Sequence, residues 1–355
     1  MRLSDLGLTK EISRRLKDID LFEFSVGRVT REHRERYVVS DGEKEYDAEV
    51  TGSLRFTADS RSDFPAVGDW VVMKIYNSDQ AIIHKVLTRK SVLSRQAVGK
   101  PGEIQIISSN IDVAFIVQAI DNNFNINRLE RYMTICYSAK IEPVLVISKT
   151  DLSTEKEIRH AVNNLEKRDN KIKYFLLSNK SLKGLDQILD FIKKGKTYCV
   201  IGSSGVGKST LINNLLEEDI LKTGQISQST NKGRHISDHR ELFVLKNGGI
   251  IIDTPGMREL GVTDNADGVK TTFQEIIDIA SRCKFPDCTH HNETGCAVIE
   301  ALNNGAIDKN SYDNYLKIKK EQERFQETIA EKRKKDKAFG KMIKNYYKDI
   351  EKNNY

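Results

Sequence analysis

The sequence predicts three parts: a small closed β-barrel, an α/β domain on a parallel sheet, and a mainly helical C-terminal part. Short strand-like runs separated by turns fill residues 24–88. After about residue 106, apolar strand-like runs alternate with amphipathic helical stretches, which is typical of a parallel α/β sheet. Three cysteines then crowd into residues 283–296, ahead of a polar, helical tail. A chain of 355 residues is too long for one small core, so separate domains are expected.

The composition is that of an ordinary globular protein, with 38% hydrophobic and 30% charged residues. A formal net charge of +6 permits a nucleic-acid partner without requiring one. The first residues lack the apolar stretch of a signal peptide, and no later run is long enough to cross a bilayer. We therefore expect a cytoplasmic protein with no membrane partner, and a monomer.

Five short runs form the predicted barrel. They are 24–30, 36–40, 46–51, 69–76 and 81–88. Asp41-Gly42 is a strong hairpin signal, and a turn at 67–69 precedes the fourth run. We describe the barrel as OB-like, although periodicity alone leaves an SH3-like barrel open.

Basic residues lie between and after these strands. They are Arg28, Arg31, His33, Arg34, Arg36, Arg55, Arg61, Arg89, Lys90, Arg95 and Lys100. One interpretation is a solvated loop surface. The other is a footprint for the phosphate backbone of RNA, and the sequence does not choose between them.

Six apolar runs are expected as strands of the α/β sheet. They are 113–120, 143–148, 173–178, 197–202, 241–246 and 249–254. The expected helices are 127–139, 155–167, 184–194 and 208–218. We place domain boundaries at 1–105 for the barrel and N-terminal segment, 106–270 for the α/β domain, 271–325 for the cysteine-rich domain, and 326–355 for a basic C-terminal helix or tail.

The strongest motif is a phosphate-binding loop of the form G-x-x-x-x-G-K-S, which follows a buried strand and opens a helix. It comprises Gly202, Ser203, Ser204, Gly205, Val206, Gly207, Lys208 and Ser209, with Thr210 next in the helix. Glycines let backbone N–H groups surround a phosphate at the helix N-terminus. Lys208 would reach the β- and γ-phosphates, and the Ser209 hydroxyl would ligate Mg²⁺.

A second element, Asp253-Thr254-Pro255-Gly256, directly follows a strand. The carboxylate of Asp253 can hold Mg²⁺, and the Gly256 N–H can contact the γ-phosphate. D-x-x-G alone is a weak signal, but about fifty residues after a P-loop it indicates a metal and γ-phosphate sensor.

The base is read by a third element. Ser148-Lys149-Thr150-Asp151 ends a strand and resembles the [NT]-K-x-D element of GTPases. A carboxylate here accepts hydrogen bonds from the ring N–H and amino group of guanine, a pair that adenine does not offer. Ser178-Asn179-Lys180 resembles the companion S-A-K loop. The sequence therefore predicts GTP in preference to ATP.

These motifs stand in an unusual order. In an ordinary GTPase the phosphate motifs precede the base-reading ones, whereas here the elements at 148 and 178 precede those at 202 and 253. The GTPase domain is therefore predicted to be circularly permuted, with its switch region connected directly to the C-terminal part.

Cys283, Cys288, His290 and Cys296 have the spacing C-x4-C-x-H-x5-C. Three thiolates and one imidazole suit a structural, tetrahedral Zn²⁺. His291 is an alternative fourth ligand, because spacing does not separate neighbouring histidines. Cys136 and Cys199 lie in apolar surroundings and are expected to be buried.

Permuted GTPase motifs, a preceding barrel and this cysteine-histidine site together resemble the ribosome small-subunit-dependent GTPase A (RsgA, or YjeQ) family. Residues 64–70 resemble the family's barrel signature, and Gly233-Arg234-His235 resembles its first switch. The resemblance implies a late-acting GTPase that binds the 30S subunit and its rRNA and is stimulated by it. It also implies that the barrel and the zinc domain contact rRNA.

Two departures from the family pattern concern the nucleotide. Ser148 stands where Asn or Thr is usual, and Ile236-Ser237 replaces a Thr-Thr pair, so Ser237 becomes the Mg²⁺ ligand that the resemblance implies. Thr230 is a more distant candidate. Met257 stands where many GTPases place a water-orienting Gln, so slow intrinsic hydrolysis is expected.

By the same resemblance, His235 is the candidate catalytic residue beside Lys208. An ordinary loop histidine is the competing interpretation, and Arg234 is a further source of charge. Two other functions remain: an RNA-binding assembly factor whose nucleotide domain barely hydrolyses GTP, and a P-loop ATPase or kinase, against which Asp151 argues. The tail carries a lysine-rich cluster at 332–337 that suits RNA or solvent.

Overall fold

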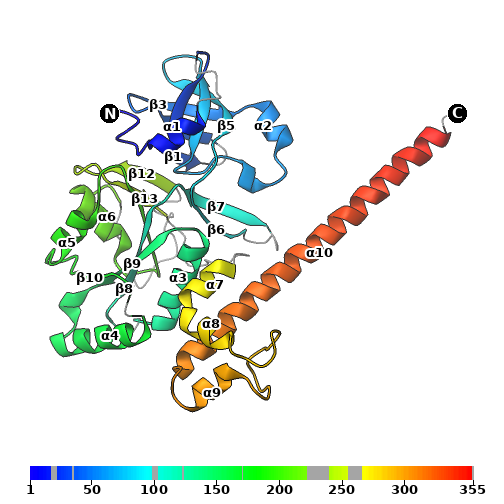
Figure 1. Cartoon of the computed structure of the whole chain (residues 1–355). Helices are drawn as coiled ribbons and strands as arrows, with labels where there is room; N and C mark the ends of the chain where they lie inside the picture. Colours follow the sequence, from blue (N-terminus) through cyan, green and yellow to red (C-terminus); the bar gives the residue numbers. More distant parts are fainter. Residues whose placement is uncertain are drawn as a thin grey trace, which may run out of the picture.

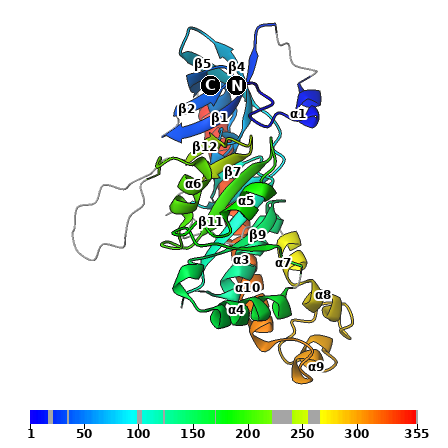
Figure 2. The same cartoon turned by 90° about the vertical axis from the view of Figure 1, so that its left-hand side faces the viewer.

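The computed structural model describes residues 1–16, 22–33, 36–97, 103–121, 124–169, 171–221, 240–254 and 266–353. A β-barrel lies at one end of the molecule and an α/β domain in the middle (Figure 1). The short helices α7 (Ala266–Thr272), α8 (Gln274–Ala280) and α9 (Ala297–Asn303) lie at the other end. Figure 2 shows the same order from the side.

Five strands form the barrel. They are β1 (Ser25–His33), β2 (Arg36–Ser40), β3 (Glu45–Val50), β4 (Trp70–Ile75) and β5 (Gln80–Val86). Their order is β1-β2-β3-β5-β4, and pairing of β1 with β4 closes the barrel. Strands β3 and β5 are parallel, whereas the other neighbours are antiparallel. This closed arrangement, with helix α2 (Gly52–Thr57) between β3 and β4, is OB-like and decides between the two predicted barrels.

The barrel strands show the period of two that a one-sided core requires. Along β3, exposed and buried residues alternate, with Tyr46, Ala48 and Val50 turned inward. They pack with Val71 and Met73 of β4. The alternation is what made these short runs readable as strands in the sequence.

Arg28 contradicts both interpretations of the basic residues, because its side chain is only 1% exposed. It donates hydrogen bonds to the carbonyl oxygens of Leu6 (2.6 Å) and Gly68 (3.2 Å) and to Thr197 Oγ1 (3.0 Å). Its guanidinium lies 5.5 Å from the centre of the Trp70 ring. Burial lowers the pKa of Arg28 to about 10. The prediction was wrong here because a basic residue on a short strand can point inward when backbone carbonyls receive it.

Six strands of the sheet of the α/β domain lie in the described residues. They are β8 (Val113–Ala119), β9 (Glu142–Ser148), β10 (Tyr174–Leu176), β11 (Thr197–Gly202), β12 (Arg240–Val244) and β13 (Ile250–Asp253). Their order is β10-β9-β8-β11-β13-β12. All neighbours are parallel except β12, which is antiparallel to β13. A tight turn at Asn247-Gly248 joins these two strands, and a short turn permits only antiparallel pairing.

Helices cover both faces of this sheet. The helices in the described part of the domain are α3 (Ile126–Ser138), α4 (Glu155–Arg168), α5 (Leu185–Phe191) and α6 (Lys208–Leu216). Alternate residues of β8 serve the two layers: Phe115 packs in the same core as α5 and α6, and Ile116 in the core with α3, α4 and α7. The central strands are therefore buried on both sides, which explains their continuous apolar runs.

The barrel and the α/β sheet are joined edge to edge. Strand β1 pairs with β12, so the two parts form one sheet of 11 strands. At the junction Arg240 forms an ion pair of 3.2 Å with Glu32. A separate hairpin of β6 (Val92–Gln96) and β7 (Ile104–Ser109) follows the barrel and was not predicted. The remaining short elements are helix α1 (Lys10–Arg15) and the 3-10 turns η1 (Arg61–Asp63) and η2 (Thr150–Leu152).

The C-terminal part ends in one helix of 45 residues, α10 (Lys309–Asn353). Its outer portion projects away from the rest of the molecule (Figure 1). The beginning of the helix is anchored by buried Ile318 and Phe325 and by a paired contact of Glu321 with Arg131 of α3. The helix continues through residue 325, where the sequence placed a domain boundary.

Candidate functional site

The phosphate-binding loop connects β11 to α6. Gly202 ends the strand with φ +145°, and Gly207 caps the helix with φ +94°. A Cβ on Gly202 would lie 2.3 Å from the carbonyl oxygen of Val117, so the close approach of β8 requires glycine. The Lys208 Nζ donates to the carbonyl oxygen of Ser203 across the loop at 2.5 Å. The loop thus lies at the N-terminus of α6, where backbone N–H groups can bind phosphate.

Asp253 ends β13, the strand next to β11, and pairs in register with Val200. Its carboxyl group is buried, and burial raises its pKa to about 6, while nearby Lys208 acts in the opposite direction. The adjacent Thr254 hydroxyl donates to the carbonyl oxygen of Val200 at 3.0 Å, which fixes the end of the strand. Gly256, His235, Arg234, Ser237 and Thr230 lie outside the described residues.

The residues predicted to read the base lie at the ends of β9 and β10. Asp151 lies in η2, just after the end of β9. Lys149, which precedes η2, adopts a left-handed conformation with φ +60°. The buried Ser178 donates its hydroxyl to Asp151 Oδ1 at 2.7 Å. This bond holds the carboxylate in one orientation and leaves its second oxygen for a ligand.

Hydrogen bonds tie the base-reading half to the phosphate half. The Ser148 hydroxyl lies 2.6 Å from the carbonyl oxygen of Val206 and 3.3 Å from that of Gln118. Asn179 Nδ2 donates to the carbonyl oxygen of Gly207 at 3.1 Å, and Asn214 of α6 donates back to Asn179. Residues far apart in the sequence therefore form one rigid frame.

A cavity of about 420 Å³ opens between these halves. It is lined by Lys149, Asp151, Asn179, Lys180, Ser204, Gly205, Gly207, Lys208, Ser209 and Thr210. This volume is within the range of small-ligand sites. The structure thus brings the residues of both predicted motifs to one pocket, at the carboxyl ends of the parallel strands, where α/β sheets bind ligands.

Arg128, in the first turn of α3, was not singled out in the sequence. Its Nη1 donates to the Ser203 hydroxyl of the phosphate-binding loop at 3.1 Å. The Asn125 side chain caps the helix by accepting from the Arg128 N–H. The Gln118 side chain in turn donates to the carbonyl oxygen of Asn125 and accepts from its N–H. No pattern in the sequence marks this arginine, because the contact spans 75 residues.

The three cysteines and His290 form a cluster that can bind a metal ion, since their ligand atoms all lie within 4.8 Å of one another. His290 Nδ1 lies 3.6 Å from the sulfur of Cys283 and 3.6 Å from that of Cys296, and the two sulfurs are 3.9 Å apart. Metal–sulfur bonds of about 2.3 Å and metal–nitrogen bonds of about 2.0 Å require edges of about 3.5–3.8 Å in a tetrahedron. The donor set and the three separations among Cys283, His290 and Cys296 therefore fit a tetrahedral site.

The structure also separates the two histidines. His290 is buried and points into the cluster, with φ +64°, whereas His291 is exposed. Glu293 holds the loop by accepting from the backbone N–H groups of Thr289 (2.7 Å) and His291 (2.9 Å). The hydroxyl of Tyr312 in α10 donates to the carbonyl oxygen of His290 at 2.5 Å, which connects the cluster to the long helix.

The other two cysteines, Cys136 and Cys199, are buried as predicted. Burial raises the pKa of both thiols, that of Cys199 to about 12. Across the described ranges, no helix combines the length and apolar character that a membrane span needs.

Comparisons with known proteins agree with this architecture. The sequence model of the RsgA GTPase family matches residues 86–263, and that of the 50S ribosome-binding GTPases matches residues 197–335. The first match includes the base-reading strands that precede the phosphate-binding loop. The second begins at β11, the strand that leads into that loop.

Curated relatives match over most of the chain. The small ribosomal subunit biogenesis GTPase RsgA 1 of Bacteroides thetaiotaomicron is 37% identical, over 98% of this chain and 97% of its own length. RsgA 2 of Lactiplantibacillus plantarum is 41% identical, over 83% of each chain.

Solved structures share the fold. YjeQ from Thermotoga maritima is 27% identical and superposes with a TM-score of 0.62, covering 84% of this chain and 98% of that one. YloQ, described as a circularly permuted GTPase, is 23% identical with a TM-score of 0.61, covering 87% and 98%. Family model, relatives and fold agree, and the chain belongs to the RsgA GTPase family.

Proposed function

We propose that this protein hydrolyses GTP during biogenesis of the small ribosomal subunit, bound to rRNA and activated by the subunit. The observation that carries the proposal is the pocket of about 420 Å³ that unites Asp151 with the phosphate-binding loop. Membership of the RsgA GTPase family and relatives named as small ribosomal subunit biogenesis GTPases support the same function. Such a protein would act as a monomer and pass between GTP- and GDP-bound forms.

Asp151 would select guanine, since its free carboxylate oxygen can accept a hydrogen bond from the base while Ser178 holds the other. Backbone N–H groups from Gly205 to Thr210 would bind the phosphates at the start of α6. Lys208 would turn from the carbonyl oxygen of Ser203 to the β- and γ-phosphates.

Two metal ions fit the residues present. The Ser209 hydroxyl and the Asp253 carboxylate are the hard oxygen donors that Mg²⁺ prefers, and Ser237 would be a third. Mg²⁺, when bound, neutralises charge on the β- and γ-phosphates. The cysteine-histidine cluster suits Zn²⁺ in a structural role, because all four positions are filled by protein ligands.

Orientation of the attacking water is assigned to His235, with Arg234 as a source of charge. Met257 cannot orient water, so hydrolysis without the subunit should be slow. An rRNA-bound first switch would bring the histidine to the γ-phosphate. This ordering by a partner is a general way of switching GTPases.

The test is GTP hydrolysis by the purified protein, alone and with 30S subunits, with Asp151→Asn as the control for base selection. Strong stimulation by 30S subunits, with the preference for GTP over ATP lost in the variant, is the expected result. Equal, slow turnover in every sample would instead favour the alternative, an RNA-binding assembly factor with a nucleotide domain that barely hydrolyses GTP.

A further inference from the structure

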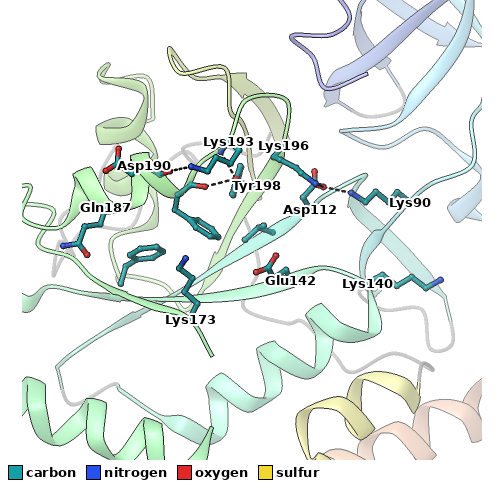
Figure 3. A pocket seen from close by; sticks show the side chains of 13 residues that line it. Lys90, Asp112, Lys140, Glu142, Lys173, Gln187, Asp190, Lys193, Lys196 and Tyr198 are labelled. Atoms are coloured by element: carbon teal, nitrogen blue, oxygen red, sulfur yellow. Dashed lines mark hydrogen bonds and ion pairs between the residues drawn. The ribbon is translucent and has the colours of Figure 1, made fainter. Parts of the chain in front are cut away.

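A second cavity, of about 770 Å³, opens at the other end of the sheet strands from the nucleotide pocket. It lies at the amino ends of the parallel strands, where Val113 of β8 lines it. Figure 3 shows Glu142 of β9 and Tyr198 of β11 beside it. The end of α5 forms one wall, and Lys90, in the connection from the barrel, stands at the rim. None of the GTPase motifs contributes to it.

Lysines dominate the charge of this cavity. Five lysines face three carboxylates, and they come from segments that are distant in the sequence. The lysines are Lys90, Lys140, Lys173, Lys193 and Lys196, and the carboxylates are Asp112, Glu142 and Asp190. Positive charges that converge on a concave surface strengthen the local electrostatic potential and attract polyanions.

Two of the lysines are fixed by one carboxylate. Asp112 accepts from both Lys90 and Lys196, the latter at 2.9 Å, and from the Thr197 N–H at 2.9 Å. Its own charge is therefore neutralised from both sides (Figure 3). The amines of this pair are held close together at the rim while each side chain remains about half exposed.

Lys140 and Lys173 differ from that pair. Within the described part of the chain, neither forms an ion pair, and both side chains are exposed. The Lys173 Nζ instead lies 4.4 Å from the centre of the Phe191 ring and 5.7 Å from that of Phe175. Cation–π contact places this amine over an aromatic floor without neutralising its charge.

The floor itself is rigid. Tyr198 stacks on Phe115 with ring centres 5.3 Å apart, and its hydroxyl accepts from the Lys193 N–H at 2.9 Å and donates to the carbonyl oxygen of Phe191 at 3.3 Å. The cavity is thus a preformed surface of aromatic groups, uncompensated lysines and two further acceptors, Glu142 and Asp190.

We propose that this cavity binds a single-stranded segment of RNA, with the lysines on its phosphates. The carboxylates of Glu142 and Asp190 would accept from base amino groups or ribose hydroxyls, which a simple polyanion lacks. The cavity is larger than the nucleotide pocket and open, as passage of a strand requires. The inference rests on the proposed function, which supplies the RNA as part of the small subunit.

The position of Lys90 adds a structural reason. This residue lies between β5 of the barrel and β6, and its N–H donates to Asn110 Oδ1 at 2.9 Å. A strand bound here would touch the connection to the barrel and the α/β domain together. It would therefore extend rRNA contacts onto the face of the GTPase domain that lies away from GTP.

The test compares the Lys140→Gln/Lys173→Gln double variant with the intact protein, in binding a labelled single-stranded RNA of about 12 nucleotides. Each phosphate contact on a single strand contributes about 0.7 to the slope of log K against log salt, so the slope should fall by about 1.4. A slope change of this size corresponds to an affinity about 25-fold lower near 0.1 M salt. Among the described residues neither lysine side chain has an ion-pair partner, and Lys173 loses only its ring contacts, so folding should be preserved.

The matched control is Lys156→Gln/Lys167→Gln, which removes two exposed lysines from α4 and should leave slope and affinity unchanged. An unchanged slope in the cavity variant would overturn the inference. So would competition for the cavity by guanosine monophosphate as strong as that by the RNA, which would indicate a mononucleotide site. GTP hydrolysis with 30S subunits is a separate readout: its failure in the intact protein overturns the proposed function, whatever the RNA slope shows.

Discussion

The Ser148 hydroxyl donates a hydrogen bond of 2.6 Å to the carbonyl oxygen of Val206 and so joins the end of β9 to the phosphate-binding loop. Ser148 is fully buried. The family pattern has Asn or Thr at this position. The structure shows that the shorter side chain still makes a link between the base-reading and phosphate-binding halves.

Replacing Ser148 by Ala should weaken GTP binding about fivefold, because a buried carbonyl loses a partner worth about 1 kcal/mol. Titration with a fluorescent GTP analogue measures the change. Ser148→Thr keeps the hydroxyl and should bind nearly as well as the intact protein. Equal affinity in Ser148→Ala would show that the link does not support the site.

Arg128 occupies an unfavourable position for a cation, the N-terminal turn of a helix, yet it contacts the phosphate-binding loop through Ser203. A bound polyanion would offset this cost. Arg128→Gln should therefore lower kcat/KM for GTP about tenfold, the effect expected for one charge-assisted hydrogen bond.

Arg159→Gln, which removes an exposed arginine of α4, is the matched control. Ser203→Ala distinguishes two roles for Arg128. If the arginine only positions the loop, both variants raise KM alike, whereas a direct effect on phosphate charge lowers kcat in Arg128→Gln alone. An unchanged kcat/KM in Arg128→Gln would exclude both.

The sequence predicted the elements whose evidence is local. The buried runs at 113–119 and 197–202 were readable as central strands, and the glycines of the phosphate-binding loop marked the turn after the second. Pairing of β1 with β12 was not predictable, since nothing in either strand specifies an edge contact 210 residues away in sequence (Arg31 with Glu241).

Side-chain direction was the other limit. Arg28 looked like its basic neighbours until the structure placed it inside, facing Leu6 and Thr197. Likewise His290 and His291 are equivalent by spacing, and only the loop conformation separates them. Such choices depend on contacts between distant segments, which composition and period do not encode.

Arg28 is expected to stabilise the fold and to have no part in RNA binding. Arg28→Met should lower the free energy of unfolding by about 3 kcal/mol, because buried carbonyl oxygens of Leu6 and Gly68 lose their donors. Urea denaturation measures this, and exposed Arg36→Met is the control. If Arg28→Met instead weakened RNA binding and left the free energy of unfolding unchanged, Arg28 would belong to the RNA-binding surface after all.

His290, and not His291, should be required for the metal. His290→Ala should lose most of its bound zinc, measured by elemental analysis, and should melt at a lower temperature because metal binding contributes directly to folding. His291→Ala changes an exposed neighbour and should keep about one equivalent of zinc. The reverse result would assign the fourth ligand to His291.

Asp112 gives the fold a pH dependence of known sign. Burial favours the protonated form, but hydrogen bonds from Lys90, the Thr197 N–H and Lys196 outweigh it and lower the pKa of the carboxyl group. The buried Arg28 guanidinium also interacts electrostatically with this carboxylate. Because the folded pKa lies below the ordinary value of 3.8, the stabilisation is complete above pH 3.8 and is lost as the pH falls through the folded pKa.

Asp112→Asn should therefore destabilise the protein by about 2 kcal/mol near neutral pH, the order of hydrogen bonds to a charged group. The difference from the intact protein, measured by urea denaturation, should stay constant from pH 7 to about pH 5 and narrow below 3.8. Asp186→Asn, at an exposed position of α5, should show no such trend. If the stability difference between the two proteins instead grew as the pH fell, the Asp112 carboxylate would not be stabilised by Lys90 and Lys196. The inference that Asp112 fixes these two lysines at the rim of the cavity would then be wrong.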